Sequence, residues 1–321
     1  MSHHDRINRK KISLIGAGQI GGVMTLLAAQ KQLGDIVLLD IPAYEKLAQG
    51  KMLDILHAAP VYNADAKITA TADWDATRDS DVVIVSAGFP RKPGMSRDDL
   101  LLKNCEITKP VAENIKKYCP NAFVIAIQNP LDAMVQLTKV LTGFPKNRVV
   151  GQAGILDSVR FRAFIAMELN VSVQDVTAVV LGGHGPTMVP LVRYCNVAGI
   201  PVTQLLPKEK IDAIVKRTQD AGTEIVALYG TGSAFFSPAA ASIDMAEAII
   251  RDKKRVVCCA AFLEGEYGFK DYYMGVPVIL GGGGVEKVIE VEINDEERKA
   301  LGASFEATKK NIDELKRLNV I

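Results

Sequence analysis

The chain has 321 residues, 48% of them hydrophobic, and its 38 Lys and Arg residues nearly balance its 37 Asp and Glu residues. This length predicts about two domains, and the near-neutral charge excludes a global field that would attract nucleic acid or an anionic membrane. No apolar run approaches the roughly 20 residues that span a bilayer, and the start MSHHDRINRKK is too polar for a signal peptide. We therefore expect a cytoplasmic protein whose partner is a small molecule.

The cysteines show no pattern of a metal site or of a disulfide framework. They form no CxxC pair, and no histidine stands at metal-ligand spacing from them. The five positions are Cys105, Cys119, Cys195, Cys258 and Cys259. We expect reduced core thiols, with neither a disulfide nor structural zinc.

The first half alternates short strand-like segments with segments of helical periodicity. The six strand-like segments are 11–18, 35–40, 67–73, 81–88, 123–130 and 149–154. Buried-type strands separated by helices imply right-handed crossovers and a parallel sheet. Residues 1–150 are therefore predicted to form a doubly wound α/β domain of the Rossmann type.

The second half, residues 151–321, has a less regular pattern and is predicted to be a mixed α+β domain that binds the substrate. The predicted elements are a helix at 156–169, a strand at 176–183, helices through 207–250, strands at 255–264 and within 274–293, and a helix after Asn294. Asn294 is a polar start suited to a helix N-terminus. There is no repeat or flexible linker, so the two halves are expected to pack closely.

The sequence GAGQIG at 16–21 follows the first strand and opens the first helix, as a dinucleotide-binding fingerprint requires. Gly16 permits a tight turn, Gly18 lets the backbone approach a pyrophosphate, and Gly21 allows the helix to pack on the strand. The helix N-terminus would then receive the anion. Ala17, Gln19 and Ile20 complete the predicted cofactor loop.

Asp40 closes the second strand, 19 residues after Gly21. A carboxylate there can accept a hydrogen bond from a ribose 2′-hydroxyl and would repel a 2′-phosphate. Because Ile41 and Pro42 follow it in place of a basic residue, the sequence favours NAD over NADP. A solvated residue at a strand end is the alternative.

Three further segments carry residues that could take part in catalysis or in substrate binding. His184 stands between glycines after an apolar strand, where an acid/base residue or a structural turn histidine could lie. Asp157 and Arg160 share one face at a helix start, either as a site or as a local ion pair. Asn129 ends the fifth strand at the carboxyl edge, where ligands bind in open α/β sheets, although Asn-Pro also forms turns.

Together these segments resemble the lactate/malate dehydrogenase superfamily, in order and over nearly the whole chain. The matching segments are GAGQIGG, LLDI, GFPRKPGMSRDDLL, IQNPLD, ILDSVRFR and GGHGPTMVP. The resemblance implies that His184 donates and accepts the proton, that Asp157 orients the His184 ring, and that Arg160 binds the substrate carboxylate. Arg97 would polarise the reacting carbonyl from a closing loop.

The resemblance also implies the remaining contacts. Asn104, Ile127 and Gln128 would approach the cofactor, Asn129 would approach both cofactor and substrate, and residues 86–88 would line the cleft. Gln128 departs from the Thr of many relatives at a backbone contact. His57 is expected to be structural, on a helix that meets another subunit in the family. The pattern is most similar to the lactate-dehydrogenase-like malate dehydrogenases, which commonly form tetramers.

The loop GFPRKPGMSRDDLL at 88–101 bears on the substrate. Its Pro and Gly residues suit a lid that closes over a ligand. If the substrate ended in a methyl group, the charge of Arg91 would be buried without a partner, which is costly. A second carboxylate would pair with it, and the resemblance likewise places Arg at this position in malate enzymes. We predict oxaloacetate and malate as substrates. Lactate dehydrogenase is the alternative, followed by a dinucleotide sensor without chemistry.

Overall fold

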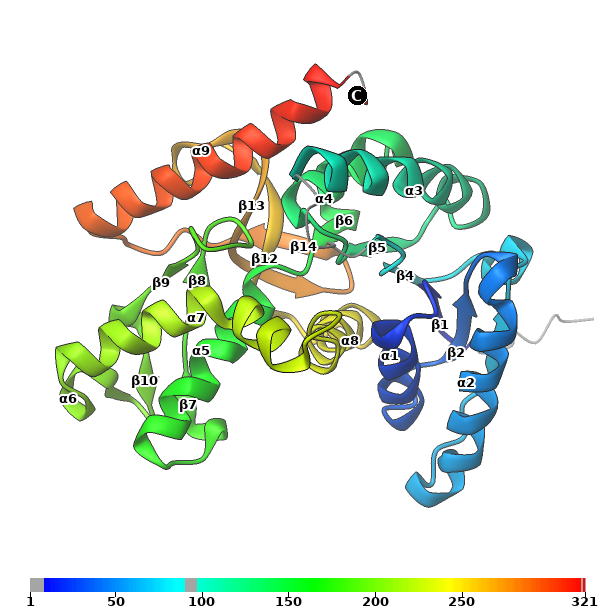
Figure 1. Cartoon of the computed structure of the whole chain (residues 1–321), viewed down its shortest axis with the longest axis horizontal. Coiled ribbons are helices and arrows are strands. Elements are labelled where there is room, and N and C mark those ends of the chain that lie inside the picture. The colour runs from blue at the N-terminus through cyan, green and yellow to red at the C-terminus, as the bar shows by residue number, and fades with distance from the viewer. Residues whose placement is uncertain (1–8, 90–96, 319, 321) are drawn as a thin grey trace, which may run out of the picture.

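The computed structural model describes residues 9–89, 97–318 and 320 (Figure 1). Its first half forms a parallel sheet with the order β3-β2-β1-β4-β5-β6, which is the Rossmann order and confirms the predicted fold class. All six predicted strands are present. Their bounds are β1 (Lys11–Ile15), β2 (Asp35–Leu39), β3 (Ile68–Thr71), β4 (Val82–Val85), β5 (Phe123–Ala126) and β6 (Val149–Gly151).

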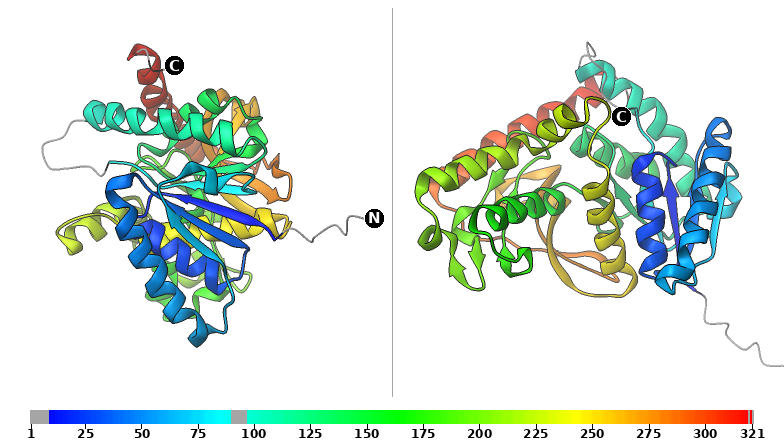
Figure 2. Two further views of the ribbon diagram at one scale, coloured as in Figure 1. Left: turned by 90° about the vertical axis from the view of Figure 1, so that its right-hand side faces the viewer. Right: turned by 60° about the horizontal axis from the view of Figure 1, so that its bottom comes forward.

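Helices cover both faces of this sheet. One face carries α1 (Gln19–Gln30) and α2 (Glu45–Ala58), and the other carries α3 (Arg97–Tyr118) and α4 (Leu131–Thr142), as the left view of Figure 2 shows. Alternate strand residues point to opposite faces, so Leu14 packs with the first pair of helices. Its neighbour Ile15 packs with the second pair.

The same sheet continues into the second half of the chain. Strands β12 (Arg255–Glu264), β13 (Lys270–Gly281) and β14 (Gly284–Val288) extend it in antiparallel fashion, with Ala260 beside Gly151 of β6. Helix α8 (Phe236–Ile250) packs in the same hydrophobic cluster as α1. The two halves are therefore joined through one sheet and one shared core.

The predicted strand at 176–183 is wrong in detail, because the segment divides between two small sheets. β7 (Val176–Thr177) pairs with β10 (Asn196–Val197), while β8 (Val180–Leu181) pairs with β9 (Val189–Pro190). β11 (Ile200–Pro201) also pairs with β10. The apolar run is continuous in sequence, but its pairing is decided by segments that come later in the chain.

The helices of the second half follow their predicted positions, apart from a short helix that precedes the predicted range 207–250. They are α5 (Gly154–Leu169), α6 (Val202–Leu205), α7 (Lys208–Tyr229), α8 and α9 (Asp295–Arg317). Asn294 begins α9 as predicted: its Oδ1 accepts a hydrogen bond from the Glu297 amide at 2.8 Å, and Glu297 Oε2 accepts one from the Asn294 amide at 2.9 Å. This reciprocal capping satisfies backbone donors that the helix itself leaves unpaired.

Among the described residues, none of the helices is long and apolar enough to cross a membrane. The same residues contain no group of three or more His, Cys, Asp or Glu side chains arranged to hold a metal ion. The five cysteines are buried as free thiols.

Candidate active site

The predicted cofactor loop lies between β1 and α1 and is shaped by its glycines. Gly16 has φ of +110°, and a Cβ atom there would lie 2.7 Å from the Ala87 amide nitrogen. A Cβ on Gly21 would lie 1.9 Å from the Gly16 carbonyl oxygen. A Cβ on Gly18 would meet nothing within 4 Å. Two glycines thus allow close packing, and the third leaves open space at the helix N-terminus.

This open end fits an anionic group. Gly18 begins α1 without a side-chain cap, and the first turn, which includes Gln19 and Ile20, carries no acidic residue. The positive end of the helix dipole therefore meets no negative side chain from its own helix. The loop residues thus fit the diphosphate of a dinucleotide.

Asp40 is tied to the loop by hydrogen bonds. Its Oδ2 accepts from the Ala17 amide at 2.6 Å, and its Oδ1 accepts from the Ile41 amide at 2.8 Å. The carboxylate is therefore held beside the cofactor loop at the carboxyl end of β2. Lys51 also contacts this loop, through the Ala17 and Gly18 carbonyls. We use the name cofactor end of the site for the loop 16–21, Asp40 and Lys51.

Asn104 and Gln128 hold the segment that follows β4. Asn104 Oδ1 accepts from the Phe89 amide at 2.6 Å, and its Nδ2 donates to the Asn129 carbonyl at 2.6 Å. Gln128 is buried and donates through Nε2 to the Ala87 carbonyl at 2.6 Å. Both side chains therefore fasten backbone at the carboxyl edge of the sheet.

The residues beside them differ in exposure. Ile127, directly after β5, is buried, whereas Asn129, which follows Gln128, is exposed. Ser86 Oγ donates to the carbonyls of Ile15 and Gly16, at 3.0 and 3.2 Å, so it lies against the turn that opens the cofactor loop.

The structure brings three predicted residues together in the second half of the chain. His184 Nδ1 lies 2.9 Å from Asp157 Oδ2, and Arg160 Nη1 lies 3.5 Å from Asp157 Oδ1. Asp157 and Arg160 come from the start of α5, and His184 comes from the turn after β8. Burial opposes the charged imidazolium, but the attraction and hydrogen bond of Asp157 outweigh it and raise the pKa of His184.

Arg160 is held in a setting that favours an anion. Its side chain is 11% exposed, and its Nε is buried without a hydrogen-bond partner among the described residues. Burial lowers the pKa of Arg160, although Asp157 acts against this. A buried guanidinium with an unpaired donor is costly unless a carboxylate or similar acceptor binds it.

Asp132 belongs to the site, although the sequence did not single it out. It lies in the first turn of α4 and is buried, and its Oδ2 accepts from the His184 amide at 3.0 Å. Burial raises the pKa of Asp132 to about 6, against the opposing effect of His184. The only signal in the sequence was its position within IQNPLD. We call Asp132, Asp157, Arg160 and His184 the chemical end of the site.

The side chains of both arginines in the predicted lid lie outside the part of the chain that the structure describes. Arg91 as a whole lies outside the described residues. Arg97 is the first residue of α3, so the prediction of a loop over 88–101 is wrong for 97–101, where the chain is already helical. His57 is exposed in the last turn of α2.

The fold and these two groups of residues are those expected of a dehydrogenase that binds a dinucleotide. The profile of the lactate/malate dehydrogenase NAD binding domain matches residues 10–151, and that of the lactate/malate dehydrogenase alpha/beta C-terminal domain matches residues 155–319. The chain belongs to the lactate/malate dehydrogenase family. The expected NAD-dependent oxidoreductase class is confirmed.

Individual relatives give the comparison more detail. The chain is 58% identical to malate dehydrogenase 1 of Anaeromyxobacter dehalogenans over 310 residues, which cover 96% of this chain and 99% of that one. It superposes with a TM-score of 0.93 on Cryptosporidium parvum malate dehydrogenase, at 44% identity, covering 96% of this chain and 99% of that one. The chain also superposes with a TM-score of 0.93 on lactate dehydrogenase of the same organism, complexed with lactic acid and nicotinamide adenine dinucleotide. The sequence identity is 45%, and the match covers 97% of this chain and 99% of that one.

Proposed function

We propose that this protein catalyses the reversible NAD-dependent interconversion of malate and oxaloacetate. Residues 1–150 would form the NAD-binding domain, and residues 151–321 would form the substrate-binding and catalytic domain. The observation that carries the proposal is the buried pairing of His184 with Asp157 beside Arg160. The curated relatives at 54–58% identity are malate dehydrogenases, which supports this substrate over lactate.

In the reduction of oxaloacetate, His184 is the acid. As negative charge develops on the carbonyl oxygen, the imidazolium donates its proton to that oxygen. Asp157 holds the ring orientation and stabilises the charged form through the 2.9 Å contact with Nδ1. In malate oxidation, neutral His184 takes the proton back. NADH, when bound, supplies the hydride.

Arg160 binds the substrate carboxylate next to the reacting carbon. The planar guanidinium can donate two parallel hydrogen bonds to a carboxylate, which fixes the position of the substrate more tightly than a single contact. Arg97 would polarise the carbonyl, and Asn129 would contact substrate and cofactor. The proposed cofactor residues are Gly16, Ala17, Gly18, Gln19, Ile20, Gly21, Asp40, Asn104, Ile127, Gln128 and Asn129.

Arg91 is the proposed specificity residue for the second carboxylate. Replacing it in Arg91→Gln should lower kcat/KM for oxaloacetate by at least about 10²-fold, the order expected when a desolvated charge pair is lost. The relative preference should move toward pyruvate. The measurement is kcat/KM for both keto acids, in wild type and variant, at one pH and salt concentration.

The outcomes separate the two substrates. Wild-type preference for pyruvate would overturn the malate assignment in favour of lactate dehydrogenase. An unchanged oxaloacetate-to-pyruvate ratio in Arg91→Gln would remove Arg91 as the specificity residue. Binding of NADH without any turnover of either keto acid would instead point to a sensor.

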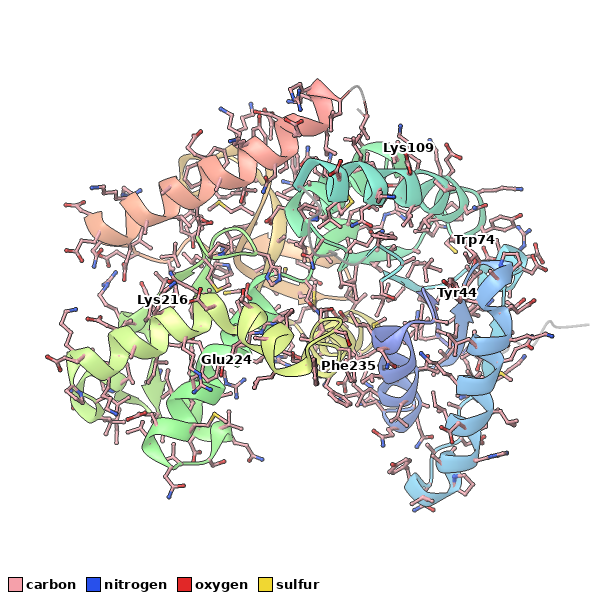
Figure 3. The ribbon with its side chains drawn as sticks, in the orientation of Figure 1. Tyr44, Trp74, Lys109, Lys216, Glu224 and Phe235 are labelled. Carbon is pink, nitrogen blue, oxygen red and sulfur yellow. The ribbon has the colours of Figure 1, made fainter. Side chains whose placement is uncertain are left out.

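A homo-oligomer, with a tetramer favoured over a dimer, is proposed as the working form. Large apolar side chains are exposed on and after α2, including Leu53 at 52% and Val61 at 78%. Tyr229 and Phe236 are exposed, and the rings of both lie against the ring of Phe235, which Figure 3 labels and which lies between α7 and α8 in the chain. Exposed apolar patches of this kind mark protein interfaces. Sedimentation equilibrium tests this, and a monomer at micromolar concentration would contradict it.

The cytoplasm is the proposed location. Buried thiols held without disulfides suit a reducing compartment. Burial raises the pKa of Cys105 to about 11, so this thiol is not poised for oxidation. Fractionation of the native host, with antibodies to the protein, would test the location.

A further inference from the structure

Lys51 reaches from α2 to the cofactor loop. Its Nζ donates to the Ala17 carbonyl at 2.7 Å and to the Gly18 carbonyl at 2.6 Å. Its stem lies along α1 at Gly22, where a Cβ would lie 3.1 Å from Lys51 Cδ. The small residue at 22 therefore leaves room for the lysine to reach the start of the helix.

These contacts fix the orientation of two peptide groups. Among the described residues the Asn129–Pro130 bond is the one cis peptide, so the peptides that follow Ala17 and Gly18 are trans. In a trans peptide the N–H points opposite to the C=O. When Lys51 holds both carbonyls on its own side, the N–H groups of Gly18 and Gln19 point to the other side.

Asp40 completes the support of the loop. Its Oδ2 holds the Ala17 N–H at 2.6 Å, so the Ala17 residue is fixed through both its donor and its acceptor. The Gly18 carbonyl also accepts the first intrahelical bond, from the Gly22 amide at 3.1 Å. The backbone of the loop is thus fixed before any ligand binds.

The charge of Lys51 is unexpected for a purely structural residue. The N-terminus of α1 is already the positive end of the helix dipole, so a cation placed there lowers the stability of the ligand-free protein. Burial lowers the pKa of Lys51, although Asp40 opposes this. A ligand with two negative charges at this end would offset the repulsion, as a diphosphate does.

We propose that Lys51 is a positioning residue for the dinucleotide. It holds the Ala17 and Gly18 carbonyls so that the N–H groups of the loop face the diphosphate, and it adds positive charge at that end of α1. The proposal rests on the NAD-binding part of the proposed function.

The test compares Lys51→Met with Lys46→Met by titration calorimetry. Methionine keeps much of the lysine stem but removes its charge and donors. Lys46 is an exposed lysine of the same helix. Lys51→Met should weaken NADH and ADP-ribose binding by roughly tenfold, as expected when hydrogen bonds to a charged group are lost. Lys46→Met should bind both ligands within about twofold of wild type, since a lone exposed charge contributes little.

Three further measurements test where and how Lys51 acts. ADP should lose more affinity than AMP, which has one phosphate, because the defect lies at the diphosphate. In steady-state kinetics the loss should appear in KM for NADH rather than in kcat. Lys51→Arg, which keeps the charge but changes the donor geometry, should recover part of the affinity.

Each outcome decides the proposal. Wild-type affinity for NADH and ADP-ribose in Lys51→Met would overturn it, as would an equal loss in Lys46→Met. Circular dichroism checks folding, and Lys51→Gln replaces the Met variant if that variant does not fold. If the wild-type protein failed to bind NADH at all, the proposed function would fall together with this inference.

Discussion

The cofactor end and the chemical end of the site use different parts of the chain. At the cofactor end, Asp40 after β2 and Lys51 on α2 hold backbone groups of the loop, and they lie 23 and 34 residues from the Ala17 groups that they hold. At the chemical end, the side chains of Asp157, Arg160 and His184 meet one another within the second half. Asp132 of the first half reaches the His184 amide 52 residues away. The first end depends on loop geometry, and the second depends on buried charge.

This comparison predicts that the two ends can be damaged separately. His184→Asn should lower turnover by about 10²- to 10⁴-fold or more, because it removes the positioned acid. NADH binding should stay within about twofold, since His184 makes none of the contacts of the cofactor loop. Steady-state rates and stopped-flow fluorescence measure the two parts. Near wild-type turnover would end the acid/base assignment.

The contact between α1 and α8 joins the two halves of the chain. Removing a charge from this contact should lower the free energy of unfolding. Glu247 of α8 is buried and pairs with Lys31 at 2.7 Å and Lys253 at 2.7 Å. Burial alone would raise its pKa, but the hydrogen bonds from Lys253 and Lys31 outweigh this and lower the pKa of Glu247 to about 2. Glu247→Gln should therefore reduce the free energy of unfolding by about 1–3 kcal/mol at neutral pH.

The pH dependence of that loss has a definite sign. Because the folded pKa lies below the unfolded value of about 4.5, the stabilisation is fully present above pH 4.5 and is lost as the pH falls toward about 2. Urea unfolding of wild type and Glu247→Gln across this range measures it. A difference that stays constant down to pH 3 would contradict the ion-pair explanation.

Coenzyme choice tests the charge at the cofactor end. Wild type should prefer NADH, because a 2′-phosphate beside Asp40 would place two negative groups together. Asp40→Asn keeps an acceptor for the Ala17 amide but removes the charge, so the NADPH-to-NADH ratio of kcat/KM should rise by roughly tenfold. Equal use of both coenzymes by wild type would show that Asp40 does not face the ribose.

The smallest expected effect concerns Asp132. The charged groups that act on His184 are Asp157, Arg160 and Asp132, and Asp132 raises the pKa of His184. Asp132→Asn keeps an acceptor for the His184 amide but removes this charge, so the pKa of His184 should fall. Oxaloacetate reduction needs the imidazolium, so its activity should decline at lower pH than in wild type. A pH profile of kcat/KM that moves to higher pH, or does not move, would exclude this role.

Local interactions made much of the molecule predictable from its sequence. The alternation of apolar and helical segments predicted the six parallel strands, and Asn294 predicted the start of α9, because caps and periodicity involve neighbouring residues. Glycine spacing predicted the cofactor loop for the same reason. His184, Asp157 and Arg160 could be proposed from their residue types and local settings.

Tertiary structure decided what those residues contact. The segment 176–183 divided between two sheets, and β12 joined the parallel sheet at Gly151, because strand pairing depends on distant segments. Asp132 and Lys51 gave little signal in sequence, since a lone Asp after Asn-Pro or a Lys on an amphipathic helix is ordinary. Their contacts with the His184 amide and the Ala17 carbonyl exist because packing carries α4 and α2 to those backbone groups, and buried polar groups require partners.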